Sequence, residues 1–277
     1  MAAWFGKEPR PRLKNVFELS SVSLRSTRPF LALKSNPLRI QHRFKTEWKD
    51  GSFSASGISF KDLFDLVMSE GVAELNGVFP ADVLTDVRQA TRAWGHANPV
   101  APPQTYEDRN YHAIESGISP RQKTPHNYHS YNFYRFNQLE DAFRSSLKRV
   151  FGPMLQFQNA LTGNEAGFEP DAQNRRARPQ VIHYPSGGGM FGKHTHPLEP
   201  QRVGLILGLS KRGKDFETGG THFGVGGRDV SSEEDHDIGD LILFRFDIPH
   251  WINWVDPVET LDYDSLRGRW TAVLPYY

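Results

Sequence analysis

Apolar residues in the first half of the chain repeat mainly at helical spacing. Three stretches would each place their apolar side chains on one helical face, namely residues 60–70, 83–94 and 139–150. Ser59 is a plausible N-cap of the first helix and Gly71 ends it, whereas Pro80 starts the second helix and Gly95 stops it. Helices are therefore expected to dominate residues 1–152.

The segments between these helices carry weaker patterns. A short strand is expected over residues 72–79, between the first two helices. Residues 97–125 are rich in Pro, Asn and polar groups without an apolar period, which predicts a long loop that covers a binding site. The third helix is expected to be capped by Asn137, with Glu140 at its third position.

From Gln156 onward, short apolar runs are separated by glycine-rich turns. These runs are residues 179–184, 202–209, 219–225, 240–246, 250–255 and 269–275. Evenly spaced short strands are typical of a sandwich or barrel. The expected fold class is therefore α+β, mainly β, with a single domain over 59–277 that divides into helical support (59–152) and a β core (153–277).

Charge separates an N-terminal arm, residues 1–58, from this domain. The whole chain has 33 Lys and Arg against 32 Asp and Glu; residues 1–50 hold 11 and 4 of these, so the remainder hold 22 and 28. We interpret the basic arm as a solvated or packed segment; a transit peptide and a nucleic-acid contact are the less favoured alternatives. The acidic remainder argues against a nucleic-acid partner.

The sequence contains neither cysteine nor a long apolar run, and each absence excludes some kinds of site or location. The chain has no cysteine, which excludes disulfides, thiolate metal sites and cysteine nucleophiles, so any metal must be held by nitrogen and oxygen. No apolar run approaches the roughly 18 residues that span a bilayer, so no membrane association is expected. A cytoplasmic location is the default expectation.

Histidines gather in the β-rich half, where six of the eleven lie between positions 183 and 250. His194 and His196 are two residues apart, so on a strand they would point to the same face. His250 follows a strand-like run, residues 239–246, and is placed to add a third nitrogen. Three ligands on one side of a metal leave open positions, the arrangement that non-haem Fe(II) oxygenases use.

These histidines belong to an ordered set of short motifs. In chain order the set is Tyr184-Pro-Ser-Gly-Gly-Gly189, His194-Thr-His196-Pro, Thr218-Gly-Gly220, Gly239-Asp-Leu-Ile-Leu-Phe244, His250 and Arg269-Trp-Thr271. With this set the chain resembles the 2-oxoglutarate/Fe(II)-dependent oxygenases, and residues 72–94 resemble the N-terminal element of the phytanoyl-CoA dioxygenase-like branch. The resemblance implies a double-stranded β-helix, a jelly-roll barrel of the cupin type, with packed N-terminal helices.

The resemblance also implies an activity and its cofactors. Fe(II) would be held by His194, His196 and His250, with 2-oxoglutarate and O2 as co-substrates. The expected reaction is oxidation of an unactivated C–H bond of a small molecule. Hydroxylation is the expected outcome, with desaturation or cyclisation as alternatives, and a role in specialised metabolism is expected. The protein is expected to be a monomer or a homodimer.

One departure from the family pattern leaves three hypotheses open. His196 stands where the family usually has Asp or Glu. The site is a three-histidine centre, or it recruits a carboxylate such as Glu199, Asp215 or Asp247, or it is a degenerate barrel that binds a ligand without catalysis. A fourth alternative, from outside this family, is a three-histidine dioxygenase that does not use 2-oxoglutarate.

The resemblance places the co-substrate on the last strand. Arg269 would bind the distal carboxylate of 2-oxoglutarate with help from Thr271, because a guanidinium makes two-pronged contacts with a carboxylate. Arg267 shares that strand face and is the rival. Tyr184 is expected to line the same pocket.

The remaining histidines and the aromatic segment before the third helix carry weaker predictions. His129, Tyr131 and Arg135 are the candidate contacts to a polar or anionic substrate. His222 is expected to be a satisfied structural histidine. His236, which lies among acidic residues, is expected to be solvated on a loop.

Overall fold

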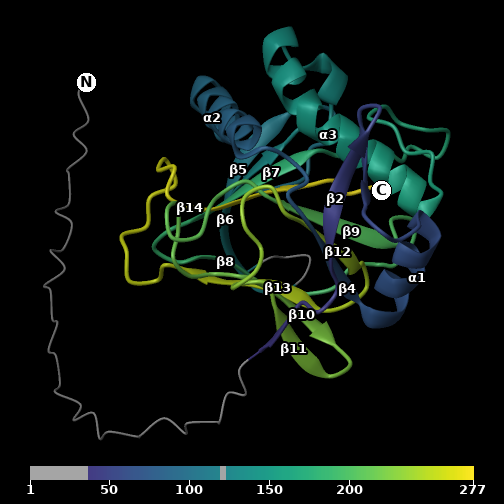
Figure 1. Cartoon of the computed structure of the whole chain (residues 1–277). Coiled ribbons are helices and arrows are strands. Elements are labelled where there is room, and N and C mark those ends of the chain that lie inside the picture. The colour runs from purple at the N-terminus through teal and green to yellow at the C-terminus, as the bar shows by residue number, and fades with distance from the viewer. Residues whose placement is uncertain (1–36, 119–122) are drawn as a thin grey trace, which may run out of the picture. The chain divides into compact units, whose positions relative to one another are not determined.

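The computed structural model describes residues 37–118 and 123–277 (Figure 1). The described residues belong to one compact unit, Pro37–Tyr277. Most of the basic arm predicted over residues 1–58 therefore lies outside the described residues. Among those that are described, no helix is both long and apolar enough to cross a membrane.

Helix α1 (Phe60–Glu70) follows the predicted start and stop signals. The Ser59 hydroxyl accepts a hydrogen bond from the backbone N–H of Asp62, and Gly71 ends the helix with a φ of 85°. Only glycine adopts such a positive φ without strain, which explains this stop.

Helix α3 (Asp141–Thr162) begins differently from the prediction. Its N-cap is Glu140, whose carboxylate accepts hydrogen bonds from the N–H groups of Ala142 and Phe143. Asn137 lies instead in the short 3-10 helix Phe136–Gln138. The 3-10 turn displaces the start of the helix, so the predicted capping box does not form.

Helix α2 (Ala81–Ala97) passes through Gly95, where the sequence predicted its end. The reason is packing, because a Cβ added at Gly95 would lie 2.6 Å from the Tyr131 ring. Glycine at this position lets the helix approach the sheet closely.

We expect Gly95→Ala to destabilise the fold by about 1–3 kcal/mol, because an added methyl overpacks the contact with Tyr131. The matched control is Gly152→Ala in α3, where the nearest atom to an added Cβ is Lys148 Cγ at 3.7 Å. The free energy of unfolding of that variant should rise by about 0.5–1 kcal/mol, because alanine has a higher helix propensity than glycine. Urea unfolding measures both, and equal gains in stability would contradict the packing role of Gly95.

The strands of the described chain form one extensively paired sheet. They are β1 (Leu38–Arg39), β2 (Arg43–Lys49), β3 (Ser52–Ala55), β4 (Val72–Asn76), β5 (Tyr111–Ile118), β6 (Pro125–Asn132), β7 (Gln180–Pro185), β8 (Gly189–His194), β9 (Val203–Gly208), β10 (Thr221–Val225), β11 (Arg228–Ser231), β12 (Leu241–Arg245), β13 (His250–Val255) and β14 (Gly268–Val273). Their order is β1-β11-β10-β13-β8-β6-β7-β14-β9-β12-β4-β2-β3, with β5 paired to β6.

Strand β6 connects the two faces of the barrel. Its first residues pair with β8 and its last residues pair with β7. One face consequently holds β8, β13, β10 and β11, and the other holds β7, β14, β9, β12 and β4. This mostly antiparallel arrangement is the predicted double-stranded β-helix, and the mainly β class with packed helices is confirmed.

Several strands differ from the sequence prediction. Residues 38–55, which the sequence analysis assigned to the basic arm, form β1, β2 and β3 in this sheet. Part of the predicted loop 97–125 is strand β5, which pairs with β6 along its whole length. The sequence pattern did not predict strand β8, because its glycines and polar residues show no hydrophobic alternation.

The helices cover one side of the barrel. α1 packs against β4 and β12, and α3 packs against β9 and the other two helices. In Figure 1 the helices lie away from β8, β10 and β13. Among the described residues no helix packs on β8, β10 or β13, and His194 and His250 lie at the ends of two of these strands.

Candidate active site

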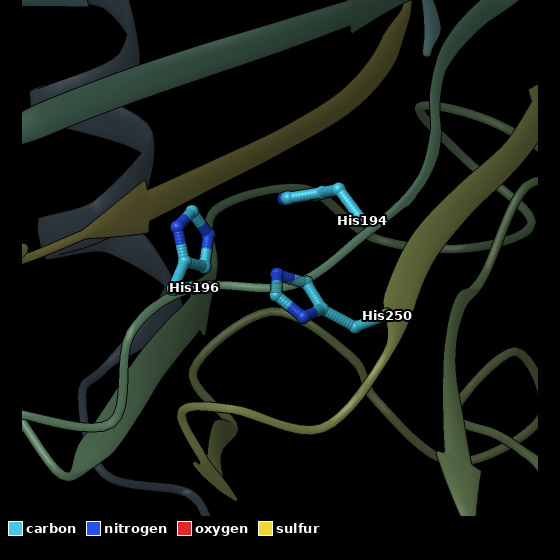
Figure 2. Close-up of side chains that lie close together, drawn as sticks. All are labelled: His194, His196 and His250. Atoms are coloured by element: carbon cyan, nitrogen blue, oxygen red, sulfur yellow. The ribbon is translucent and has the colours of Figure 1, made fainter. Parts of the chain in front are cut away.

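Three histidine side chains converge between β8 and β13. His194 is the last residue of β8 and His250 is the first residue of β13, and the two are direct partners across the antiparallel ladder. His196 lies two residues beyond the end of β8. Each residue offers one nitrogen, and these three atoms lie within 4.8 Å of one another, as Figure 2 shows by the side chains turned toward one another.

Backbone hydrogen bonds orient two of these rings. Nδ1 of His194 donates to the Gly192 carbonyl at 2.9 Å, and Nδ1 of His250 donates to the Ile248 carbonyl at 3.1 Å. A carbonyl accepts only, so Nδ1 carries the proton and the Nε2 lone pair is left for a metal. This pattern, in which the far nitrogen is tied to a carbonyl, is the usual support of a metal-binding imidazole.

Burial favours the neutral form of His194 and His250. Desolvation lowers the pKa of His194, and desolvation followed by the two neighbouring histidines lowers the pKa of His250 well below its ordinary value. Aromatic rings fix the positions, since Phe191 stacks on His194 with 4.0 Å between ring centroids and Phe246 stacks on His196 with 4.5 Å. Imidazole ligands suit Fe(II) and other divalent transition metals.

The acidic residues considered as alternative ligands lie elsewhere. Glu199 has a side chain that is 72% exposed. Each of the three acids, Glu199, Asp215 and Asp247, faces an arginine instead, at 3.9, 2.9 and 2.7 Å from Arg202, Arg88 and Arg245, respectively. Among the described residues, the group able to hold a metal contains only histidines.

Arg269 is buried on β14, directly opposite Tyr184 of β7. Its Nη2 donates to the Thr221 hydroxyl at 2.8 Å and to Nδ1 of His236 at 2.9 Å, whereas its Nε has no hydrogen-bond partner among the described residues. Burial lowers the pKa of this guanidinium to about 10, so it remains charged at neutral pH. A buried cation with an unused N–H fits an incoming carboxylate.

Arg267, the alternative candidate for binding the co-substrate, has different surroundings from Arg269. Arg267 precedes β14, has a side chain that is 51% exposed and makes a two-pronged contact with Glu259. Thr271 is buried two residues beyond Arg269 on the same strand. Only Arg269 of the two arginines is thus directed into the barrel.

His236 does not lie in solvent as the sequence suggested. It is 4% exposed, and its Nε2 donates to the Asp240 carbonyl at 2.8 Å, which leaves Nδ1 as the acceptor for Arg269. Burial, and next the Arg269 charge, lower its pKa to about 3, so it stays neutral. The acidic neighbours misled the prediction, because Asp235 turns away to bind Arg39.

His222, by contrast, has the satisfied structural environment that was expected. It is buried, and its Nδ1 lies 2.9 Å from the Asp229 carboxylate. Its Nε2 lies 2.7 Å from the side-chain nitrogen of Asn253. With both ring nitrogens engaged, His222 lies outside the three-histidine group.

A cavity of about 450 Å³ connects these elements. Its wall includes the three histidines together with Tyr184 and Thr221, the residues beside Arg269. A second wall comes from the segment 103–105 and from strands β5 and β6, through Tyr111, Glu115, His126, Tyr128, Ser130 and Asn132. The predicted loop 97–125 therefore contributes to the cavity wall, partly as a strand.

The substrate contacts predicted on β6 are not brought to this cavity. The even-numbered residues of the strand line the wall, so His129 and Tyr131 point to the opposite face. There His129 lies 2.7 Å from a nitrogen of His112, and Tyr131 packs against α2. Arg135 is also absent from the cavity wall, and its backbone N–H bonds Asn110. The cavity wall is instead formed by the neighbouring residues Tyr128, Ser130 and Asn132.

Comparisons with known proteins identify the fold. No protein-family model and no curated protein matches this chain. A prolyl-4-hydroxylase from Pseudomonas putida superposes with a TM-score of 0.52 and 14% sequence identity, covering 77% of this chain and 96% of that one. This likeness shows the fold alone.

Two further solved structures are similar to a lesser degree. One is an oxidoreductase of the 2OG-Fe(II) oxygenase family from Burkholderia pseudomallei, with a TM-score of 0.49 and 13% identity over 81% of this chain and 93% of that one. The other is a prolyl hydroxylase from Trichoplax adhaerens in complex with a peptide fragment, with a TM-score of 0.49 and 15% identity over 78% and 89%. Of these three structures, two are described as prolyl hydroxylases and one as a member of the 2OG-Fe(II) oxygenase family.

Proposed function

We propose that this protein is an Fe(II)- and 2-oxoglutarate-dependent oxygenase that oxidises an unactivated C–H bond of a small molecule. One observation carries the proposal: three converging imidazoles share a cavity with the hydroxyl partner of a buried arginine that has an unused N–H. The imidazoles fit a divalent metal, and the arginine fits the distal carboxylate of a 2-oxo acid.

Each residue has a defined task in this proposal. His194, His196 and His250 would hold the metal. When bound, Fe(II) supplies the redox chemistry that couples oxidative decarboxylation of 2-oxoglutarate to oxidation of the substrate. Arg269 binds and orients the distal carboxylate, while Tyr184 packs beside it and Thr271 extends the same strand.

The cavity walls contribute by excluding water. Phe191 and Phe246 stack on two of the histidines, so apolar rings lie beside the group that would hold the metal. Exclusion of water strengthens the electrostatic contacts of the site and limits side reactions. Hydroxylation is the expected outcome, and desaturation or cyclisation would depend on how the substrate is placed.

The decisive experiment is anaerobic addition of Fe(II) followed by 2-oxoglutarate, with the visible absorption recorded. A weak metal-to-ligand charge-transfer band that requires both components supports the proposal, and aerobic succinate formation completes it. Metal binding without a 2-oxoglutarate-dependent band would favour the three-histidine dioxygenase that uses no 2-oxo acid. Absence of metal binding would favour a degenerate, non-catalytic barrel.

Several finer assignments stay predictions. They are the phytanoyl-CoA dioxygenase-like branch, the replacement of the carboxylate ligand by His196, a role in specialised metabolism, a cytoplasmic location and a monomeric or homodimeric state. Measuring the mass in solution tests the last of these, and the ligand variants described in the Discussion test the role of His196.

The wall segment 103–105 is tied to the barrel by Glu107. The Glu107 carboxylate accepts hydrogen bonds from Arg176 at 2.9 Å and from Arg178 at 2.7 Å. The Arg176 side chain is only 2% exposed, so its charge depends on this partner. Glu107 therefore holds the wall in place.

We expect Glu107→Ala to accelerate amide hydrogen exchange in residues 103–107 by roughly tenfold or more, because charge-assisted bonds to a buried group are lost. Fe(II) and 2-oxoglutarate binding should be unaffected. The matched control is Asp108→Asn, since Asp108 is exposed and pairs with its neighbour Arg109. Equal exchange in both variants would show that Glu107 does not restrain this wall.

A further inference from the structure

The wall formed by β5 and β6 has a chemical character that the proposed metal and co-substrate sites do not use. Glu115 is the one carboxylate among the described residues that line the cavity, and this lining contains no lysine or arginine. Its side chain is 21% exposed. The cavity therefore contains a partly buried acid without a basic side chain beside it in the lining.

Aromatic rings surround this acid. Glu115 is the direct register partner of Tyr128, so the two side chains lie next to each other on the cavity face. The Tyr128 ring lies 5.2 Å from Phe191 and 5.7 Å from Tyr184. Tyr111 and Tyr134, whose centroids are 5.8 Å apart, complete the aromatic lining.

The Glu115 carboxyl has no lysine or arginine as an ion-pair partner among the described residues. Burial raises the pKa of Glu115, and the pKa of Tyr128 is raised well above its ordinary value by burial and next by the Glu115 charge. The one ion-pair partner of Glu115 among the described residues is His126, at 3.9 Å. Because burial lowers the pKa of His126, this imidazole is neutral and does not balance the carboxylate.

Two basic side chains lie over rings that line the cavity, and neither contacts Glu115. Arg178 lies over the Tyr134 ring at 5.2 Å, and its charge is paired with Glu107. Lys193 is exposed and lies over Trp251, at 4.8 Å from the ring centroid. Neither residue is among those that line the cavity beside Glu115.

The Phe191 ring lies between the wall that contains Glu115 and the three histidines. Phe191 stacks on His194 at 4.0 Å and also contacts Tyr128 at 5.2 Å and His126 at 6.1 Å. A molecule seated against Glu115 and Tyr128 would therefore extend along Phe191 toward the three histidines.

We propose that the substrate of this cavity carries a positively charged amine, an ammonium or quaternary ammonium group, held between the Glu115 carboxylate and the rings of Tyr111 and Tyr128. Aromatic faces attract cations, and the attraction grows when both partners are removed from water. The carboxylate adds a charge-assisted contact. As a statement about the substrate of the oxidation, this inference rests on the proposed function.

Two probes of equal shape test the charge. Choline carries a trimethylammonium group, and 3,3-dimethylbutan-1-ol replaces its nitrogen by carbon and is neutral. Titrating each into the metal-free full chain, with saturation-transfer NMR of the probe as the readout, should show choline binding at least roughly tenfold more tightly. This comparison needs no variant, so it does not depend on the folding of a mutant.

Two variants locate the binding. Glu115→Gln, which preserves the shape of the side chain, should remove most of the preference for choline. Glu70→Gln, which changes an exposed carboxyl at the end of α1, should leave the preference unchanged. A choline signal no stronger than that of the neutral alcohol, or a preference that survives in Glu115→Gln, overturns the proposal.

The outcome is independent of the metal-site experiment. If the wild-type protein forms the 2-oxoglutarate-dependent band but shows no preference for choline, the cationic substrate alone is overturned. A missing band in a protein that still selects choline overturns the oxygenase and leaves a cation-binding cavity.

Discussion

Replacing His250 with alanine is expected to weaken Fe(II) binding at least ~100-fold and to abolish turnover. His250 lies opposite His194 on adjacent strands. Because its Nδ1 donates a hydrogen bond to the Ile248 carbonyl, its Nε2 is the nitrogen that would bind a metal. Removing this imidazole leaves two ligands, which do not hold the metal as one face of an octahedron. Metal content after dialysis, measured by mass spectrometry, gives the result.

His222→Ala is the matched control for this variant. His222 is also a buried histidine on a neighbouring strand, but Asp229 and Asn253 engage its ring. Its replacement should leave the metal content intact. Equal metal loss in both variants would indicate a general loss of structure and would remove the specific role of His250.

Three further variants distinguish the hypotheses about the metal ligands. If three histidines hold the metal, His196→Ala should lose it, whereas Glu199→Gln should retain it because the Glu199 side chain is exposed. His196→Asp should retain metal binding, since a carboxylate is also a good ligand for Fe(II). Metal loss in Glu199→Gln combined with retention in His196→Ala would restore the carboxylate ligand instead.

Replacing Arg269 with alanine should raise the Kd for 2-oxoglutarate at least tenfold while metal binding is preserved. A hydrogen bond to a charged group contributes about 1.5–3 kcal/mol, and 1.4 kcal/mol corresponds to a factor of ten. Arg269 is buried and keeps an unused Nε–H, so its side chain is already positioned for an anion. Titration of the 2-oxoglutarate-dependent absorption band measures the change.

Arg267→Ala is the control, because that side chain is half exposed and pairs with Glu259. Its 2-oxoglutarate affinity should remain within about twofold of the wild type, since exposed ion pairs contribute little. An unchanged affinity in Arg269→Ala, or a loss in Arg267→Ala, would transfer the role to Arg267 or remove it from this strand.

Local patterns in the sequence were sufficient for the elements that depend on local physics. The start of α1 at Ser59 and its end at Gly71 follow from capping and from a positive φ, both of which are properties of a few neighbouring residues. The apolar runs of β9 and β12 are buried throughout or nearly so, and buried runs of this kind are visible without any knowledge of their partners.

Elements whose stability comes from distant partners were missed. Strand β5 is polar and half exposed, and it exists because all of its residues pair with β6. The start of α3 shifted to Glu140 because a 3-10 turn precedes it. Gly95 appeared to be a helix stop, but its small size serves the contact with Tyr131, which is far away in sequence.

For the site, the sequence by itself determined which residue types were available and in what order they occur. His194, His196, His250 and Arg269 were identified from their spacing and from the resemblance. Only the tertiary structure decided that the three histidines meet, that Arg269 rather than Arg267 turns inward, and that Tyr128 rather than His129 lines the cavity. The physical reason is that spacing constrains neighbours along one strand, whereas strand pairing and the face that each strand buries are set by contacts between residues far apart in the chain.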